Sequence, residues 1–159
     1  MSWMNSKIGA NDSVYTPVNA HKFISKTGQA VCRSSWERIF CQWADHNDAV
    51  IQWASEPIAI PYMDKTKKDN KGLPKKRHYY PDFLLKIRNS SGVEEIWLVE
   101  IKPKKETMPP KPSSRKKKST LIQENNTWMV NEAKWKSAIS YCQKRGWRFK
   151  ILTEDHLIK

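Results

Sequence analysis

The sequence has few of the residues that build disulfide scaffolds and zinc sites. Its three cysteines, Cys32, Cys41 and Cys142, are an odd number without paired spacing, and its four histidines have no metal-ligand spacing with one another or with the cysteines. This pattern excludes a disulfide framework, argues against a zinc site and predicts buried thiols in a reducing compartment.

Long apolar runs are also absent. No stretch approaches the roughly 18 apolar residues that a membrane span needs, and residues 1–7 lack the apolar segment of a secretory signal. We therefore expect a protein that stays inside the cell that makes it and has no membrane partner.

Acidic residues are scarce relative to basic ones. The chain of 159 residues has 29 Lys and Arg against 16 Asp and Glu, which gives a formal net charge of +13. This excess predicts attraction to a polyanion, with nucleic acid as the first candidate. The alternative is a basic surface without a partner.

The order of predicted elements indicates one α/β domain over residues 31–159, preceded by a polar arm over residues 1–30. The strand predicted over 94–102 has apolar residues on both faces, so it should lie inside a sheet that is covered on both sides. The other predicted elements are a helix from Ser34, strands over 49–54, 58–62, 79–88 and 147–152, a helix over 126–144, a basic loop over 65–77 and a flexible basic loop over 103–120.

The N-terminus of the first predicted helix has a capping pattern. Ser34 and Glu37 match a capping box, with Ser34 as the N-cap residue. Trp36, Phe40 and Trp43 follow at helical spacing and predict the face that packs on the core.

Residues 80–104 carry the most informative pattern. Asp82 begins one predicted strand and Glu100 lies near the end of the next, and the two are symmetric about Ser91, where a turn signal lies. In a tight antiparallel hairpin they meet across the strands, and Lys102 shares the face of Glu100 because side chains alternate. The sequence therefore predicts two carboxylates and an ammonium group at one point.

Such a group suits a divalent metal site for phosphodiester hydrolysis. Magnesium binds hard oxygen ligands and lowers the pKa of its bound water, and Asp82, Glu100 and the backbone carbonyl of Ile101 supply oxygens. Lys102 would orient or deprotonate the attacking water, or stabilise transition-state charge. The alternative is a cross-strand salt bridge of Lys102 with Asp82 or Glu100.

The Glu-x-Lys tripeptide carries little information by itself. The sequence repeats it at Glu132-Ala133-Lys134, within the second predicted helix, where we expect a solvated face. The prediction of a metal site therefore depends on Asp82 in the neighbouring strand and on the symmetric turn.

Pro81-Asp82 followed by Glu100-Ile101-Lys102 resembles the PD-(D/E)xK nuclease signature. The chain over 33–154 is similar to the nuclease domains of transposon-encoded endonuclease subunits and to the head completion nucleases of large tailed phages. The similar segments are 33–37, 56–62, 80–83, 99–103 and 149–154. The resemblance implies an αβα restriction-endonuclease-like core, with a mixed central sheet flanked by helices, and a requirement for Mg²⁺, for which Mn²⁺ can substitute.

The resemblance also assigns Glu37 to the active site, although the pattern alone favours a helix cap and one carboxylate does not easily fill both roles. The predicted catalytic residues are therefore Glu37, Asp82, Glu100 and Lys102, and the predicted metal ligands are Asp82, Glu100, Ile101 and Glu37. The sequence holds no segment for the winged helix of the transposon enzymes, so we expect the phage protein.

Basic residues on either side of this site are predicted to bind phosphates with little base specificity. They are Lys75, Lys76, Arg77, Lys104, Lys105, Arg115, Lys116, Lys117 and Lys118. The alternative is that these loops only solvate the protein. The nearby aromatic residues Tyr79, Tyr80 and Trp128 either stack on unpaired bases or pack in the core.

The expected function is that of a metal-dependent DNA endonuclease that acts on packaged DNA or its ends, in the host cytoplasm and the virion. DNA is the expected partner, together with phage portal or head–tail proteins. Two alternatives stay open: a structural virion protein that binds DNA or the portal without using the fold catalytically, and a protein that binds or cleaves RNA.

Overall fold

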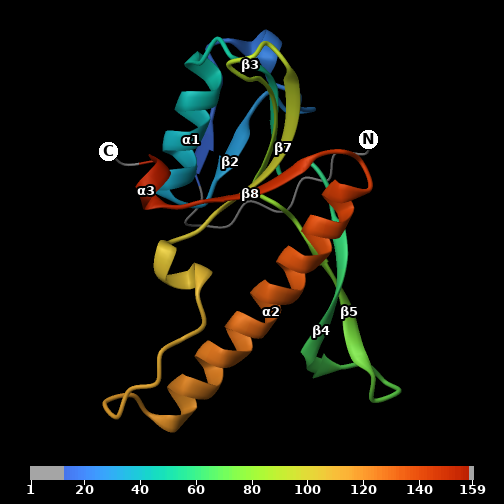
Figure 1. The fold of residues 1–159 in the computed structure, drawn as a ribbon, viewed down its shortest axis with the longest axis vertical. Helices are drawn as coiled ribbons and strands as arrows, with labels where there is room; N and C mark the ends of the chain where they lie inside the picture. Colours follow the sequence, from blue (N-terminus) through green and yellow to red (C-terminus); the bar gives the residue numbers. More distant parts are fainter. Residues whose placement is uncertain (1–12, 158–159) are drawn as a thin grey trace.

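The computed structural model describes residues 13–157 and contains a four-stranded mixed sheet between two helical layers (Figure 1). The strand order is β3 (Val50–Ser55), β6 (Phe83–Arg88), β7 (Glu94–Ile101) and β8 (Arg148–Leu152). The pairs β3–β6 and β6–β7 are antiparallel, and β8 runs parallel to β7. This architecture confirms the predicted αβα fold with a mixed central sheet.

Two helices cover opposite faces of the sheet. On one face, α1 (Ser35–His46) belongs to a core with Trp53, Phe83 and Val99. On the other face, α2 (Lys118–Gln143) belongs to a core with Leu98. Consecutive residues of β7 therefore enter different cores, which confirms that this strand is interior.

The buried face of α1 differs from the predicted one. Ser34 caps the helix as expected, since its hydroxyl accepts a hydrogen bond from the Glu37 N–H at 3.2 Å. The predicted stripe is wrong at Trp43, which is 39% exposed, while the small residues Cys41 and Ala44 are fully buried. Small side chains let the helix approach the sheet closely, and this rotates the bulky indole outward.

The predicted basic loop over 65–77 is wrong, because these residues belong to a two-stranded antiparallel ribbon. Its strands are β4 (Ile60–Lys68) and β5 (Pro74–Tyr79). The Asp69 carboxylate closes the turn by accepting hydrogen bonds from two backbone N–H groups, and the buried Asp64 is paired with Arg77 at 3.2 Å. Figure 1 shows the ribbon and α2 extending together beyond the sheet.

The predicted loop over 103–120 is also more ordered than expected. It contains a 3-10 turn, η2 (Lys104–Thr107), and α2 begins at Lys118 rather than near residue 126. An ion pair between Lys116 and Glu124 at 2.9 Å fastens the segment to the first turns of the helix. No helix within residues 13–157 combines the length and apolarity that crossing a membrane requires.

Part of the predicted arm over 1–30 lies outside the described residues, and the rest packs against the sheet. Strand β1 (Ser13–Tyr15) pairs with β2 (Ala30–Cys32), and η1 (Ala20–Lys22) lies between them in sequence. The chain after β8 forms the short helix α3 (Glu154–Leu157).

Asp45 joins this N-terminal segment to α1. Its fully buried carboxylate accepts hydrogen bonds from the Tyr15 hydroxyl at 2.7 Å, the Val18 N–H at 2.8 Å and the Asn19 N–H at 2.9 Å. Burial alone would raise the pKa of Asp45, but these hydrogen bonds outweigh it and lower the pKa.

Replacing Asp45 with Ala should therefore destabilise the protein by roughly 3 kcal/mol or more, because three donors lose a charged acceptor and two of them are backbone groups. Urea unfolding of the variant measures this change. Asp48→Ala, at an exposed acid beyond the end of the same helix, is the control. A free energy of unfolding within about 1 kcal/mol of the wild type would contradict the assignment.

Candidate active site

The β6–β7 hairpin has the register that the sequence symmetry predicts. Phe83 pairs with Val99 and Leu84 with Leu98, so the same register sets Asp82 opposite Glu100. The turn is closed by the Asn89 side chain, which accepts hydrogen bonds from the N–H groups of residues 91 and 93. The register prediction is therefore confirmed.

Asp82 is fixed at the start of β6 by backbone contacts on both sides. Its carboxylate accepts a hydrogen bond from the Ile101 N–H at 2.7 Å, and its carbonyl accepts one from the Glu56 N–H at 2.8 Å. Glu56 has a φ of 45° and pairs with Arg33 at 2.8 Å, which ties this turn to the segment before α1.

Glu100 lies on the face of the sheet that α2 covers. Its side chain is buried, and one oxygen accepts a hydrogen bond from the Tyr79 hydroxyl at 2.5 Å. The other oxygen is 3.5 Å from the Lys102 ammonium. The structure thus contains the Lys102–Glu100 salt bridge that was the alternative to a metal site, and the two interpretations are compatible.

The backbone of Lys102 depends on the last strand of the sheet. Its N–H donates to the Leu152 carbonyl at 3.0 Å. Two residues later, the Lys104 N–H donates to the Glu154 carboxylate at 2.9 Å and the Lys104 ammonium pairs with Asp155 at 2.8 Å.

A cleft of about 400 Å³ brings most of the predicted catalytic residues together. Glu37, Asp82, Ile101 and Lys102 all line it, with Glu106 at the same cavity. Glu100 is not among the lining residues, because its side chain is turned toward the α2 side. The cleft therefore lies where α1 meets the end of β7.

Glu37 serves the helix end and the cleft at once. One carboxylate oxygen accepts a hydrogen bond from the Arg33 N–H at 3.0 Å, not from the Ser34 N–H of a regular capping box. The same side chain is buried and lines the cleft. The roles of helix cap and active-site acid are therefore compatible, because one carboxylate oxygen can accept the backbone hydrogen bond while the other faces the cleft.

Negative charge is crowded at this point. Burial raises the pKa of Asp82 well above its usual range, and the neighbouring Glu100 and Glu37 carboxylates add to that rise. Burial is also the main reason that the pKa values of Glu100 and Glu37 are raised. Binding a cation here would relieve both the burial penalty and the mutual repulsion.

The oxygen donors fit a hard divalent cation that keeps several of its waters. Within residues 13–157, no three His, Cys, Asp or Glu side chains are grouped closely enough to hold a metal ion. A cation bound here would therefore contact directly at most two of the three predicted carboxylate ligands, Asp82, Glu100 and Glu37, together with the Ile101 carbonyl. Magnesium is commonly held by one or two carboxylates with water in its other positions.

Lys134 was assigned to a solvated helix face, and that prediction is wrong. Its ammonium lies 5.7 Å from the ring centroid of Tyr79 and 5.8 Å from that of Tyr62. Burial lowers the pKa of Lys134, and the nearby Glu100 opposes that effect. The available signal was its position between the buried residues Asn131, Trp135 and Ala138, on the inner face of α2.

The predicted DNA-contact residues differ in their ion pairing. Arg77, Lys104 and Lys116 have acidic partners. Among the described residues, no ion pair involves the other six, which are all exposed: Lys75, Lys76, Lys105, Arg115, Lys117 and Lys118. Of the three aromatic residues, Tyr79 is buried, Tyr80 is 36% exposed and Trp128 is half-buried.

Without a divalent metal, the Asp82 carboxyl should make stability fall as the pH rises. A raised pKa means that the folded state holds a proton that the unfolded state releases, so its contribution is complete below the ordinary value near 4 and is lost through the raised value. Asp82→Asn should flatten this part of the pH dependence and keep an acceptor for the Ile101 N–H.

Urea unfolding of the wild type and Asp82→Asn in a chelating buffer, from about pH 4 to pH 8, measures the difference between the two proteins. Asp155→Asn is the control, since the pKa of this exposed carboxyl is lowered by its pair with Lys104. A difference that does not change with pH would refute the prediction.

Comparison with known proteins places this geometry in a family. Residues 47–154 match the model of the TnsA-like endonuclease N-terminal domain, a range that contains Asp82, Glu100, Lys102 and Lys134 but begins after Glu37. The chain is also 42% identical to the head completion nuclease of Enterobacteria phage T4 over 146 residues, which cover 90% of this chain and 91% of that protein. The resemblance seen in the sequence is confirmed: the chain belongs to the family of TnsA-like endonuclease N-terminal domains and is a nuclease.

Proposed function

We propose that the protein is a divalent-metal-dependent DNA endonuclease of the PD-(D/E)xK class. Asp82, Glu100 and the Ile101 carbonyl would hold Mg²⁺, or Mn²⁺ in its place. The observation that carries the proposal is the meeting of Glu37, Asp82, Ile101 and Lys102 at one cleft, with Glu100 joined to it by the ion pair with Lys102.

A divalent cation at these oxygens supplies charge neutralisation and a more acidic water. The Lys102 side chain lines the cleft, where it would orient the water and stabilise charge that develops on the phosphate. Glu37 faces the same cleft with one oxygen held by the Arg33 N–H, and the other is available to a water of the metal.

Lys134 acts as a positioning residue in this proposal. Its ammonium lies beside the ring of Tyr79, whose hydroxyl donates to Glu100. The positive charge behind Glu100 favours the ionised carboxylate that a metal requires.

The β4–β5 ribbon and the basic residues after η2 provide the DNA contacts. A two-stranded ribbon fits the major groove of DNA, and the exposed Lys75 and Lys76 lie on this one. Lysines of this kind contact phosphates and carry little sequence information.

The T4 relative supports a role as a phage head completion nuclease, since the match spans nine tenths of both chains. The DNA acted on would then be packaged DNA or its ends, in the host cytoplasm and the virion. Portal or head–tail proteins would be further partners, and the domain would comprise residues 31–159.

A supercoiled-plasmid nicking assay tests the proposal. Mg²⁺ or Mn²⁺ should support nicking and a chelator should abolish it, and duplex DNA should compete better than duplex RNA of the same length. Nicking that persists in the chelator would contradict metal dependence, and stronger competition by RNA would contradict the choice of DNA.

A further inference from the structure

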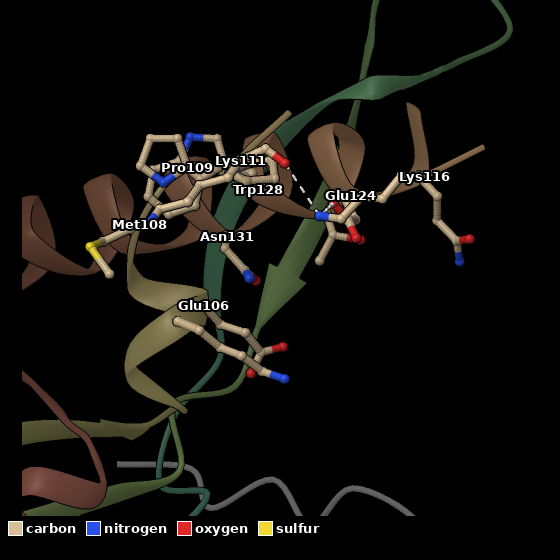
Figure 2. A pocket seen from close by; sticks show the side chains of 12 residues that line it. Glu106, Met108, Pro109, Lys111, Lys116, Glu124, Trp128 and Asn131 are labelled. Atoms are coloured by element: carbon tan, nitrogen blue, oxygen red, sulfur yellow. Dashed lines mark hydrogen bonds and ion pairs between the residues drawn. The ribbon is translucent and has the colours of Figure 1, made fainter. Parts of the chain in front are cut away.

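A second and larger cavity lies next to the proposed active site. It has a volume of about 640 Å³ and lies between the segment 105–116 and the first half of α2 (Figure 2). Glu106 lines both this cavity and the cleft that contains Asp82. The two are therefore neighbours, although this cavity contains none of the proposed metal ligands.

Part of the cavity wall is apolar. Met108, Pro109 and Pro110 line it from the segment after η2, and Trp128 lines it from α2. The Trp128 ring meets Trp135 edge-on, with ring centroids 6.0 Å apart, so the helix core holds its orientation. A fixed indole beside prolines offers a flat, apolar surface of the kind on which a nucleobase stacks.

The amide of a largely buried asparagine, Asn131, faces the same cavity. Asn131 is only 8% exposed and lines the cavity, yet its side chain has no hydrogen-bond partner among residues 13–157. Figure 2 shows its amide extending from α2 toward Glu106 on the opposite wall. This amide is thus free to pair with a ligand that has adjacent donor and acceptor groups, such as a base edge.

Positive charge surrounds the opening. Lys105 and Lys111 line the cavity and are exposed. Lys116 also lines the cavity, but its ammonium has partners within the protein. It donates to the Lys111 carbonyl at 3.3 Å and to the Glu124 carboxylate at 2.9 Å, and so holds the segment against α2. Lys105 and Lys111 therefore offer two exposed ammonium groups that can contact phosphates.

We propose that this cavity binds one unpaired nucleotide of the DNA strand, next to the cleavage centre. The proposal rests on the proposed function for the identity of the polymer. The volume of the cavity is within the roughly 300–1,000 Å³ that small-molecule sites occupy. A base that is paired and stacked within a duplex cannot enter the cavity. The enzyme should therefore prefer DNA with unpaired nucleotides, such as an end, a flap or a gap.

Fluorescence anisotropy with the full chain in a chelating buffer tests this. The probes are a labelled single-stranded DNA oligonucleotide, its RNA counterpart and the matching DNA duplex. Trp128→Leu should weaken binding of the DNA single strand about tenfold, the order expected when one stacked base loses its aromatic partner. Duplex affinity should change less than about twofold, and Trp128→Phe should retain most of the single-strand affinity.

Two further variants ensure that the test does not depend on whether Trp128→Leu folds. Asn131→Leu fills a similar volume without the amide and should show the same selective loss. Trp43→Leu, at an exposed tryptophan of α1 that lines neither cavity, should change neither affinity.

Equal losses of single-strand and duplex affinity in Trp128→Leu and Asn131→Leu, or no loss in either variant, would overturn the proposal. So would tighter binding of the RNA strand than of the DNA strand. A wild type that binds the DNA single strand selectively but never nicks a plasmid would remove the proposed catalytic function and leave this site standing.

Discussion

Asp82→Asn should reduce nicking of supercoiled DNA by about 10³-fold or more while leaving the protein at least as stable as the wild type near neutral pH. The loss follows because an amide is a poor ligand for magnesium. The stability follows because the variant removes one of three crowded carboxylates and keeps the acceptor for the Ile101 N–H. Opposite changes in activity and stability separate a functional residue from a structural one.

Variants of the two lysines near Glu100 extend the same assay. Lys102→Met should lose about 10²–10³-fold in rate, the cost of removing a charge that stabilises the transition state. Lys134→Met should lose less, about 10-fold, with part of the loss recovered at higher metal concentration, because it acts through Glu100. Lys136→Met is the matched control, since this exposed residue of α2 pairs with Glu132 and lines neither cavity.

Nicking rates from single-turnover time courses, together with urea unfolding of each variant, provide the measurements. Wild-type rates for Asp82→Asn or Lys102→Met would refute the assignment of the catalytic site. A wild-type rate for Lys134→Met would remove only the positioning role.

Removing charge from the β4–β5 ribbon should weaken binding to duplex DNA by about 10²-fold or more in the triple variant Lys68→Gln, Lys75→Gln, Lys76→Gln. With a salt slope of about −0.9 per neutralised phosphate, each such phosphate is worth roughly tenfold between 1 M and 0.1 M salt. The slope of the logarithm of affinity against the logarithm of salt should also become shallower by about one for every phosphate that the variant no longer neutralises.

The control variant removes the same formal charge elsewhere, at Lys26, Lys136 and Lys144. If total charge attracts the DNA, both triple variants weaken binding equally, and the ribbon has no special role. If the ribbon holds the DNA, only the first variant loses affinity and salt dependence. Binding titrations at several salt concentrations distinguish the two outcomes.

The parts of this fold that follow local rules were predictable from the sequence. The β6–β7 register follows from a short turn and from alternation, and the start of α1 follows from a side-chain cap at Ser34. Both depend on residues within a few positions of one another, so their physics is contained in a short stretch of sequence.

The errors arose where tertiary contacts decide the outcome. The basic stretch from Lys65 to Arg77 has the composition of a loop, yet it pairs as a ribbon because the buried Asp64 binds Arg77 across the two strands. Trp43 looked like a core residue, but the close approach of Cys41 and Ala44 to the sheet fixes the rotation of α1. Neither interaction can be seen in a local pattern.

The carboxylates of the candidate site could be predicted from the sequence. The residues that surround them could be predicted only in part. Asp82 and Glu100 could be paired through the hairpin, but Lys134 lies on a helix far away in sequence and was placed in solvent. What distinguishes it from Lys136 is the face of α2 on which it lies. A lysine within a row of buried positions is the signal to look for in such helices.

The hydrogen bond from the Lys102 N–H to Leu152 bears on when the enzyme becomes active during its synthesis. Strand β8 runs parallel to β7 and joins it only after the whole of α2 has been made. Contacts between residues so distant in sequence form late and slowly. Lys102, the proposed catalytic lysine, therefore lacks this backbone contact until β8 has left the ribosome and docked, so a nascent chain would carry the carboxylates before the proposed site is complete.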